Sequence, residues 1–182
     1  MPFIETKLKG AIIIEPKIFE DHRGYFFESY NKQHYVDNGI PADFVQDNES
    51  FSGRGTLRGL HYQAGEHAQA KLVRVIQGRV IDVAVDLRED SPTYGEHVTV
   101  ELSAENKKLF YIPRGFGHGF VVLSETALFS YKCDNFYNKA SEGGIIFNDA
   151  TLNIDWGIKA DDMILSEKDS VLPAFGSHIK AL

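Results

Sequence analysis

The alternation of apolar and polar positions along the chain of 182 residues predicts many short strands and little helix. The clearest strand pattern covers residues 71–88, where valine, isoleucine, leucine and alanine predominate. One helix is expected over residues 31–38, before Gly39 and Pro41. Further strands are expected at residues 11–14, 44–48, 57–62, 97–102, 110–112, 120–123 and 126–131. This pattern favours an all-β sandwich or barrel.

Gln77 and Gly78 interrupt the 71–88 run and predict a two-residue hairpin turn. In that register Lys71 and Asp82 become diagonal neighbours on one face, which is otherwise apolar: Val73, Val75, Val80 and Ala84. A buried charge is costly unless it is paired, so the lysine and the carboxylate are expected to interact. Two interpretations stay open, a salt bridge at the end of a sandwich and a lysine that lines a pocket.

Residues 58–63 are the best candidate for the catalytic part of the chain. Arg58 and His61 stand three residues apart on a short predicted strand, and Gly55 and Gly59 let the backbone approach a ligand closely. A cation beside an imidazole can clamp an anion and move a proton. Taken alone, such a pattern more often reflects a surface arginine and a hydrogen-bonded structural histidine.

Several later segments carry further candidates. A glycine-rich turn over residues 113–119 delivers His118 to the start of a strand. Tyr131 shares a strand face with Ala127 and Phe129, a pattern more typical of core than of catalysis. Residues 138–144 are expected to form a loop, residues 165–169 a capped helical turn, and residues 175–182 a frayed tail.

Composition narrows the possible classes of function. Hydrophobic residues make up 43% and charged residues 25% of the chain, as in a globular protein with a sizeable core. The apolar runs are too short to cross a bilayer, and the N-terminus lacks the apolar core of a signal peptide. The net charge of -7 argues against nucleic-acid binding. Cys133 is the only cysteine, which fits a reducing cytoplasm.

Five motifs together resemble one known family. They are residues 58–63 (Arg-Gly-Leu-His-Tyr-Gln), 71–73 (Lys-Leu-Val), 82–86 (Asp-Val-Ala-Val-Asp), 91–94 (Ser-Pro-Thr-Tyr) and 113–120 (Pro-Arg-Gly-Phe-Gly-His-Gly-Phe). The chain resembles the dTDP-4-dehydrorhamnose 3,5-epimerases, and the likeness extends over residues 21–169. It implies a cupin-type jelly roll with a few short helices.

The resemblance also implies how one domain, residues 1–182, is organised. Residues 1–50 would supply N-terminal strands and an arm that contributes to a homodimer. Residues 51–135 would form the central barrel, and residues 136–182 a C-terminal loop with short helical segments.

A metal site is not expected. Cupins that bind metal carry His-x-His followed by a glutamate, whereas this chain has His61-Tyr-Gln63 and then Lys71. Two histidines and a lysine supply too few ligands, and the ammonium would repel a cation. No cofactor is therefore expected.

The resemblance implies epimerisation of dTDP-4-dehydro-6-deoxyglucose on both sides of its ketone. His61 corresponds to the family's base, and Asp169 to the carboxylate that orients it. Lys71 corresponds to the cation near the keto oxygen, with Asp82 holding it. Tyr131 corresponds to the proton donor on the opposite face of the sugar.

The resemblance also implies a set of substrate contacts, with Tyr137 as a second pocket tyrosine. The implied binding residues are Arg23, Glu28, Gln46, Asp47, Asn48, Arg58, Lys71, His118, Tyr137, Glu142 and Lys168. Some family members carry arginine in place of Lys168, and lysine lacks its two-pronged geometry. Arg23 and Glu28 belong to the arm and are expected to serve the neighbouring protomer.

Three alternatives stay open at this point. One is an epimerase that acts at a single carbon or on a CDP- or GDP-linked keto-sugar. A metal-dependent cupin dioxygenase is disfavoured by Gln63 and Lys71. A sugar-binding cupin without catalysis would leave the joint presence of His61, Lys71, Tyr131 and Asp169 unexplained.

Overall fold

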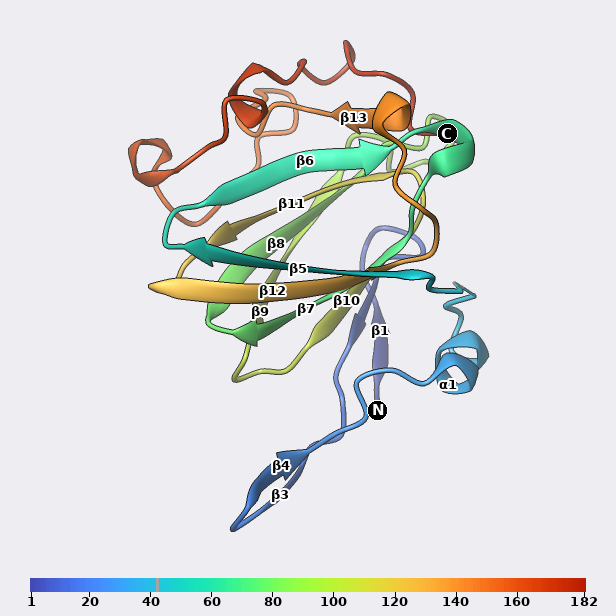
Figure 1. The fold of residues 1–182 in the computed structure, drawn as a ribbon. Coiled ribbons are helices and arrows are strands. Elements are labelled where there is room, and N and C mark those ends of the chain that lie inside the picture. The colour runs from blue at the N-terminus through green and yellow to red at the C-terminus, as the bar shows by residue number, and fades with distance from the viewer. Residues whose placement is uncertain (42) are drawn as a thin grey trace.

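Two antiparallel sheets stacked face to face form the body of the protein, as a computed structural model shows (Figure 1). The structure describes residues 1–41 and 43–182. The six-stranded sheet has the order β1 (Phe3–Glu5), β2 (Ile12–Ile14), β10 (Leu109–Ile112), β7 (Lys71–Gln77), β12 (Thr126–Cys133) and β5 (Gln46–Gly53). The five-stranded sheet has the order β13 (Glu142–Gly144), β6 (Leu57–Gln63), β11 (Phe116–Val122), β8 (Arg79–Asp86) and β9 (His97–Ser103). The all-β jelly-roll prediction is confirmed.

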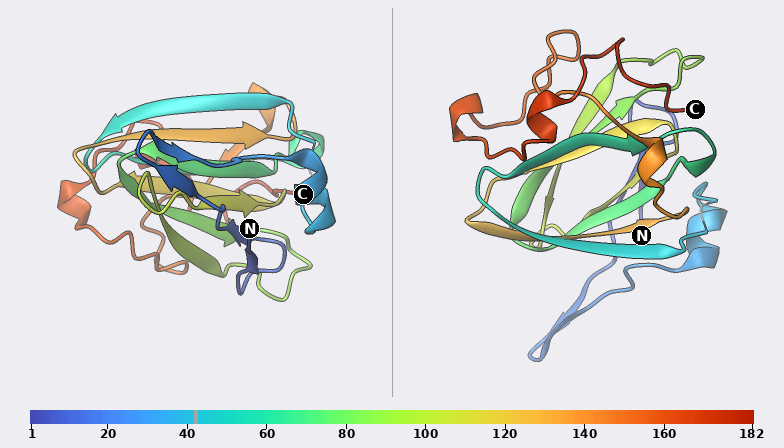
Figure 2. Two further views of the ribbon diagram at one scale, coloured as in Figure 1. Left: turned by 90° about the horizontal axis from the view of Figure 1, so that it is seen from below. Right: turned by 45° about the horizontal axis from the view of Figure 1, so that its top comes forward.

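The remaining elements are short. A two-stranded arm, β3 (Phe19–Asp21) and β4 (Gly24–Phe26), projects away from the body (Figures 1 and 2). The helix α1 (Lys32–Asp37) begins where the sequence predicted, because the Asn31 side chain accepts the His34 N–H as its N-cap. Within the described residues, four single 3₁₀ turns complete the set: η1 (Gly65–His67), η2 (Lys139–Ser141), η3 (Ala160–Asp162) and η4 (Asp169–Val171).

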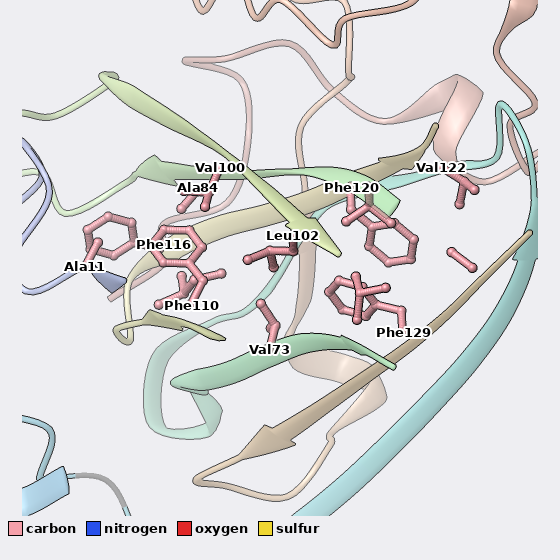
Figure 3. Close-up of a cluster of buried hydrophobic side chains, with 14 of the residues drawn as sticks. Ala11, Val73, Ala84, Val100, Leu102, Phe110, Phe116, Phe120, Val122 and Phe129 are labelled. Carbon is pink, nitrogen blue, oxygen red and sulfur yellow. The ribbon is translucent and has the colours of Figure 1, made fainter. Parts of the chain in front are cut away.

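The main core fills the space between the two sheets. Figure 3 shows Val73 and Phe110 from the six-stranded sheet meeting Leu102 and Phe116 from the five-stranded sheet. Phe120 and Phe129 stack across the gap with ring centroids 4.1 Å apart. Burying a side chain of this kind contributes roughly 1.5–3 kcal/mol. The contact joins the two sheets, and both rings also line the cavity between them.

The hairpin predicted at Gln77 and Gly78 is wrong. β7 pairs with β10 and β12, whereas β8 pairs with β11 and β9, so the two strands lie in different sheets. Gly78 turns the chain from one sheet to the other at φ +80, and a Cβ there would lie 2.0 Å from the Thr126 carbonyl oxygen. The predicted faces nevertheless hold, because Val73, Val75, Val80 and Ala84 all enter the same core.

Some element boundaries also differ from the prediction. β5 continues to Gly53, well beyond the expected end at residue 48. β11 begins at Phe116, so His118 lies inside a strand rather than at its start. Residues 142–144, expected to belong to a loop, form β13 and pair with β6.

The C-terminal segment is packed, which corrects the expectation of a frayed tail. Residues 145–182 lie over the outer face of the five-stranded sheet, where Trp156 donates its indole N–H to the Phe147 carbonyl at 2.9 Å. Ala181 is buried, and the Tyr62 hydroxyl donates to the Ile179 carbonyl at 2.5 Å. In the described part of the chain, no helix has the length and apolar character needed to cross a bilayer.

Candidate active site

A cavity of about 320 Å³ opens between the two sheets, within the size range of small-molecule sites. One wall belongs to the six-stranded sheet and the other to the five-stranded sheet, and the segment that contains η4 closes one side. The lining residues are Glu49, Ser50, Arg58, His61, Lys71, His118, Phe120, Phe129, Tyr131, Ser166, Lys168 and Asp169.

His61 and Asp169 form a close pair at the cavity wall. The His61 Nε2 lies 2.5 Å from the Asp169 Oδ1, although 108 residues separate them in the chain. Burial raises the pKa of the Asp169 carboxyl, but hydrogen bonds from His61 and from the Ser166 hydroxyl outweigh it, so the pKa lies below its ordinary value. An ionised carboxylate can orient the imidazole and stabilise its charged form.

Lys71 reaches the same cavity from β7 on the opposite wall. Burial lowers the pKa of its ammonium, with partial opposition from Cys133 and Asp82. Its Nζ lies 5.9 Å from the centre of the Tyr131 ring. A desolvated cation interacts strongly with negative charge that develops nearby.

Asp82 does not hold Lys71 directly, which corrects the pairing expected from the hairpin. The Asp82 Oδ2 instead lies 2.9 Å from the His118 Nε2, and no ion pair joins Asp82 to Lys71 among the described residues. Its Oδ1 is buried without a hydrogen-bond partner in this part of the chain. Burial raises the pKa of Asp82 and lowers that of His118.

Tyr131 lines the cavity from β12, next to Lys71 and across from His61. Burial raises the pKa of its phenol, so the hydroxyl keeps its proton at neutral pH. A protonated phenol on one wall and an imidazole on the other could serve opposite faces of a flat intermediate.

Lys168 connects the cavity to two predicted residues at its rim. Its ammonium pairs with the Glu142 carboxylate, and the Tyr137 hydroxyl donates to that carboxylate at 3.4 Å. Burial raises the pKa of Glu142, but the contact with Lys168 lowers this pKa by a larger amount. The net shift is therefore downward.

Five of the other predicted binding residues lie outside this cavity, namely Arg23, Glu28, Gln46, Asp47 and Asn48. Arg23 pairs with Asp21 in the exposed arm, and Glu28 accepts a hydrogen bond from Asn31. On β5 the Gln46 amide donates to Asn48, and Asp47 pairs with Lys132 at 2.9 Å. Arg58 does line the cavity, where its Nε donates to the Ser52 hydroxyl at 3.2 Å.

Five lining residues were missed by the sequence analysis: Glu49, Ser50, Phe120, Phe129 and Ser166. Ser50 could have been found, because the alternation that places Gln46 and Asn48 on one face of β5 continues to it. Its hydroxyl is buried without a partner within the described residues. The same alternation places Phe129 beside Tyr131 on β12 and Phe120 beside His118 on β11. Glu49 and Ser166 carry no sequence signal that separates them from surface residues.

Metal ligands are not assembled at this site. Within residues 1–41 and 43–182, no three His, Cys, Asp or Glu side chains cluster closely enough to hold a metal ion. Gln63, which stands in the position of the second cupin histidine, instead accepts the Asn138 backbone N–H at 2.7 Å.

A sequence model of the dTDP-4-dehydrorhamnose 3,5-epimerase family matches residues 5–177. The chain belongs to this family. A dTDP-4-dehydrorhamnose 3,5-epimerase from Methanothermobacter thermautotrophicus is 53% identical over 168 residues, which is 92% of this chain and 90% of that protein.

Solved structures of dTDP-4-dehydrorhamnose 3,5-epimerases share the fold. The crystal structure of the enzyme from Elizabethkingia anophelis is 62% identical, with a TM-score of 0.94 over 97% of each chain. A dTDP-6-deoxy-D-glucose-3,5-epimerase from Legionella pneumophila, in complex with dTDP-4-keto-L-rhamnose, is 48% identical. Its TM-score is 0.93, covering 97% of this chain and 93% of the other.

Proposed function

We propose that this protein converts dTDP-4-dehydro-6-deoxyglucose to dTDP-4-dehydrorhamnose by inverting C3 and C5. The main support is that His61, Lys71 and Tyr131 line one cavity in a chain of this epimerase family. Hydrogens at C3 and C5 flank the C4 ketone, which acidifies both. Inversion then needs a base, a group that stabilises the enolate oxygen, and an acid on the opposite face.

His61 is the proposed base. Its imidazole removes a proton from the carbon, the electron pair of the C–H bond passes into the enolate, and the ionised Asp169 at 2.5 Å stabilises the imidazolium that forms. Lys71 faces the keto oxygen, where its ammonium offsets the negative charge of the enolate. Base, cation and acid are side chains of the protein, so the proposed reaction uses no metal or other cofactor.

Tyr131 is the proposed acid. It lies on the six-stranded wall, whereas His61 lies on the five-stranded wall, so a sugar between them meets the two groups on opposite faces. Return of a proton from Tyr131 to the face opposite His61 inverts the carbon. The phenol supports this role because burial favours its protonated form.

Binding of the nucleotide part is proposed to use the cationic and rim residues. Arg58 and His118 are assigned to the sugar and diphosphate, with Asp82 orienting His118 rather than Lys71. Tyr137, Glu142 and Lys168 form the rim. Gln46, Asp47 and Asn48 are assigned to further substrate contacts from β5.

A homodimer is part of the proposal. All six residues of β3 and β4 are exposed, and Phe19, Tyr25 and Phe26 leave apolar surface uncovered at 54, 58 and 70%. An arm of this kind suits packing against a second copy, where Arg23 and Glu28 would reach the partner's cavity. A cytoplasmic location is also proposed, in keeping with the free, buried Cys133.

Solvent exchange tests the proposed reaction directly. The purified protein, in deuterated water and without added NAD or metal, is expected to place deuterium at both C3 and C5 of the keto-sugar. Exchange at one carbon would reduce the reaction to a single epimerisation. Binding without any exchange would favour the non-catalytic sugar-binding alternative, and CDP- and GDP-linked substrates would test the nucleobase.

A further inference from the structure

Four polar side chains, which we name the loop clip, join the end of β6 and the following turn η1 to residues 134–141. Their members are Gln63, His67, Asn138 and Ser141. The His67 Nε2 lies 3.0 Å from the Asn138 Nδ2, and its Nδ1 lies 3.1 Å from the Ser141 hydroxyl. The Gln63 Oε1 accepts the Asn138 backbone N–H at 2.7 Å. His67 does not line the cavity.

The 134–141 loop carries part of the proposed binding site. Tyr137 lies within it, and Glu142 follows it and holds Lys168 at the cavity. From Glu142 onward the chain is held by β13, because Glu142 itself pairs with Gln63 of β6. Tyr137 itself is 53% exposed, so its position depends more on hydrogen bonds of the loop than on packing. Asn138 makes these bonds on one side of Tyr137, and Asn135 makes them on the other.

The directions of these hydrogen bonds require a particular form of His67. The Asn138 Oδ1 accepts the Ala140 N–H at 2.9 Å, so the side-chain NH₂ of Asn138 must face His67. The His67 Nε2 must then accept, because the amide nitrogen can only donate. The ring proton therefore sits on Nδ1 and is donated to the Ser141 hydroxyl, which makes the ring neutral.

We propose that neutral His67 is a positioning residue, which holds the 134–141 loop so that Tyr137 meets the sugar nucleotide. A second ring proton on His67 converts Nε2 from an acceptor into a donor, which then faces the Asn138 NH₂, another donor. This contact is lost, Asn138 is released, and the sugar nucleotide binds more weakly. The inference rests on the proposed function, because that function assigns Tyr137 to the substrate.

The charged groups on the packed segments are Glu66 on η1, Asp134 and Lys139 on the loop, and Glu142 beside it. Asp134 is already paired with Arg114 at 2.8 Å. Among the described ion pairs, His67 is paired with Glu66, and the Glu66 Oε1 lies 3.9 Å from the His67 Nδ1. Its side chain is 89% exposed, so water screens this contact. Lys168 already engages Glu142. The hydrogen-bond mismatch at Asn138 therefore dominates the effect of protonation.

The test is calorimetric binding of dTDP-glucose at about pH 8 and about pH 5.5, between which histidines as a class change charge. This ligand suits the test because its diphosphate diester does not titrate in that range. His67→Gln supplies an acceptor and a donor without titrating, and His67→Phe supplies neither. His97→Gln, on the far edge strand β9, removes a different histidine as the matched control.

Binding by the wild type and by His97→Gln is expected to weaken on acidification about three- to tenfold more than binding by His67→Gln. His67→Phe is expected to bind three- to tenfold more weakly than the wild type already at about pH 8. Equal acid weakening in the wild type and His67→Gln would overturn the proposal, as would undiminished binding by His67→Phe.

Amide hydrogen exchange of residues 134–141 provides a readout that needs no ligand. After correction for intrinsic rates, acidification is expected to speed exchange at Asn138 and Ala140 in the wild type but not in His67→Gln. If acidification speeds exchange equally in the wild type and in His67→Gln, the proposed role of His67 in the loop clip is contradicted. If neither the wild type nor any variant binds dTDP-glucose, the result counts against the proposed function. The hydrogen-exchange result would still test whether His67 holds the loop.

Discussion

His61 and His118 lie directly opposite each other on the neighbouring strands β6 and β11, yet their rings occupy different environments. The His61 side chain is 29% exposed and pairs with Asp169, whereas the His118 side chain is 7% exposed and pairs with Asp82. Burial lowers the pKa of His118. The more exposed His61 is therefore the ring that is better placed to exchange a proton with a bound sugar.

The first prediction concerns the proposed base. His61→Ala should lower turnover by about 10²–10⁴-fold, the usual contribution of a positioned acid or base. Asp169→Asn should lower it by at least about 10²-fold, because the amide cannot stabilise an imidazolium. Ser170→Ala, at the exposed neighbour on η4, is the control. Undiminished turnover in His61→Ala, measured by conversion of the keto-sugar, would rule out the assigned base.

Tyr131→Phe should separate proton removal from inversion. The variant keeps the ring beside Lys71 and loses only the hydroxyl. Exchange of solvent deuterium into the starting sugar should persist, while formation of inverted product falls by about 10²–10⁴-fold. Nuclear magnetic resonance can follow both signals in one sample. Tyr111→Phe, a buried tyrosine on β10 outside the cavity, serves as the control. An unchanged ratio of inversion to exchange would exclude Tyr131 as the acid.

Lys71 should give the reaction an alkaline limit. Its charged form stabilises the enolate, and burial lowers its pKa from the ordinary 10.5, so it loses its proton at a lower pH than an ordinary lysine does. Turnover should therefore begin to decline at a pH below 10.5, the ordinary pKa of a lysine. Lys71→Arg stays charged throughout, so whatever activity remains should lack this decline. A wild-type profile that stays flat beyond that pH would contradict the assignment.

Asp86 should make folding sensitive to acid. Its buried carboxylate accepts hydrogen bonds from Arg88, Ser91 and Thr93, and although burial raises its pKa these bonds lower it from 3.8 to about 2. Because the folded-state pKa is depressed, the stabilisation is complete above the unfolded value and is lost as the pH falls towards about 2.

Asp86→Asn should lower the free energy of unfolding by about 2–4 kcal/mol near neutral pH, because the amide replaces a paired, buried charge. The difference from the wild type should shrink between about pH 5 and pH 3 in denaturant titrations. A difference that stays constant over this range would show that ionisation of Asp86 contributes nothing.

Gly78 and Gly39 provide a matched pair for the turn between the sheets. Both have φ near +80, but a Cβ at Gly78 would meet the Thr126 carbonyl oxygen at 2.0 Å, whereas one at Gly39 meets nothing within 4 Å. Gly39→Ala should lower the free energy of unfolding by about 1–2 kcal/mol, because alanine disfavours the left-handed backbone conformation. Gly78→Ala should cost at least about 2 kcal/mol more, measured by thermal or denaturant unfolding. Equal losses would mean that the corner relaxes without strain.

The amino-acid sequence by itself determined which side chains face the core. Val73, Val75, Val80, Asp82 and Ala84 point inward as the alternation predicted, because opposite orientation of successive side chains is a local property of an extended chain. The same reasoning placed Ala127, Phe129 and Tyr131 together. Specific motifs were also sufficient to indicate the family.

Only the tertiary structure decided which strands pair and which charges meet. The alternation of β7 and β8 is equally consistent with one sheet or with two facing sheets, and the corner at Gly78 selects the second. Asp82 consequently meets His118 instead of pairing with Lys71. The contact between His61 and Asp169 closes a separation of 108 residues, which no local pattern encodes, because it depends on how the C-terminal segment folds back over β6.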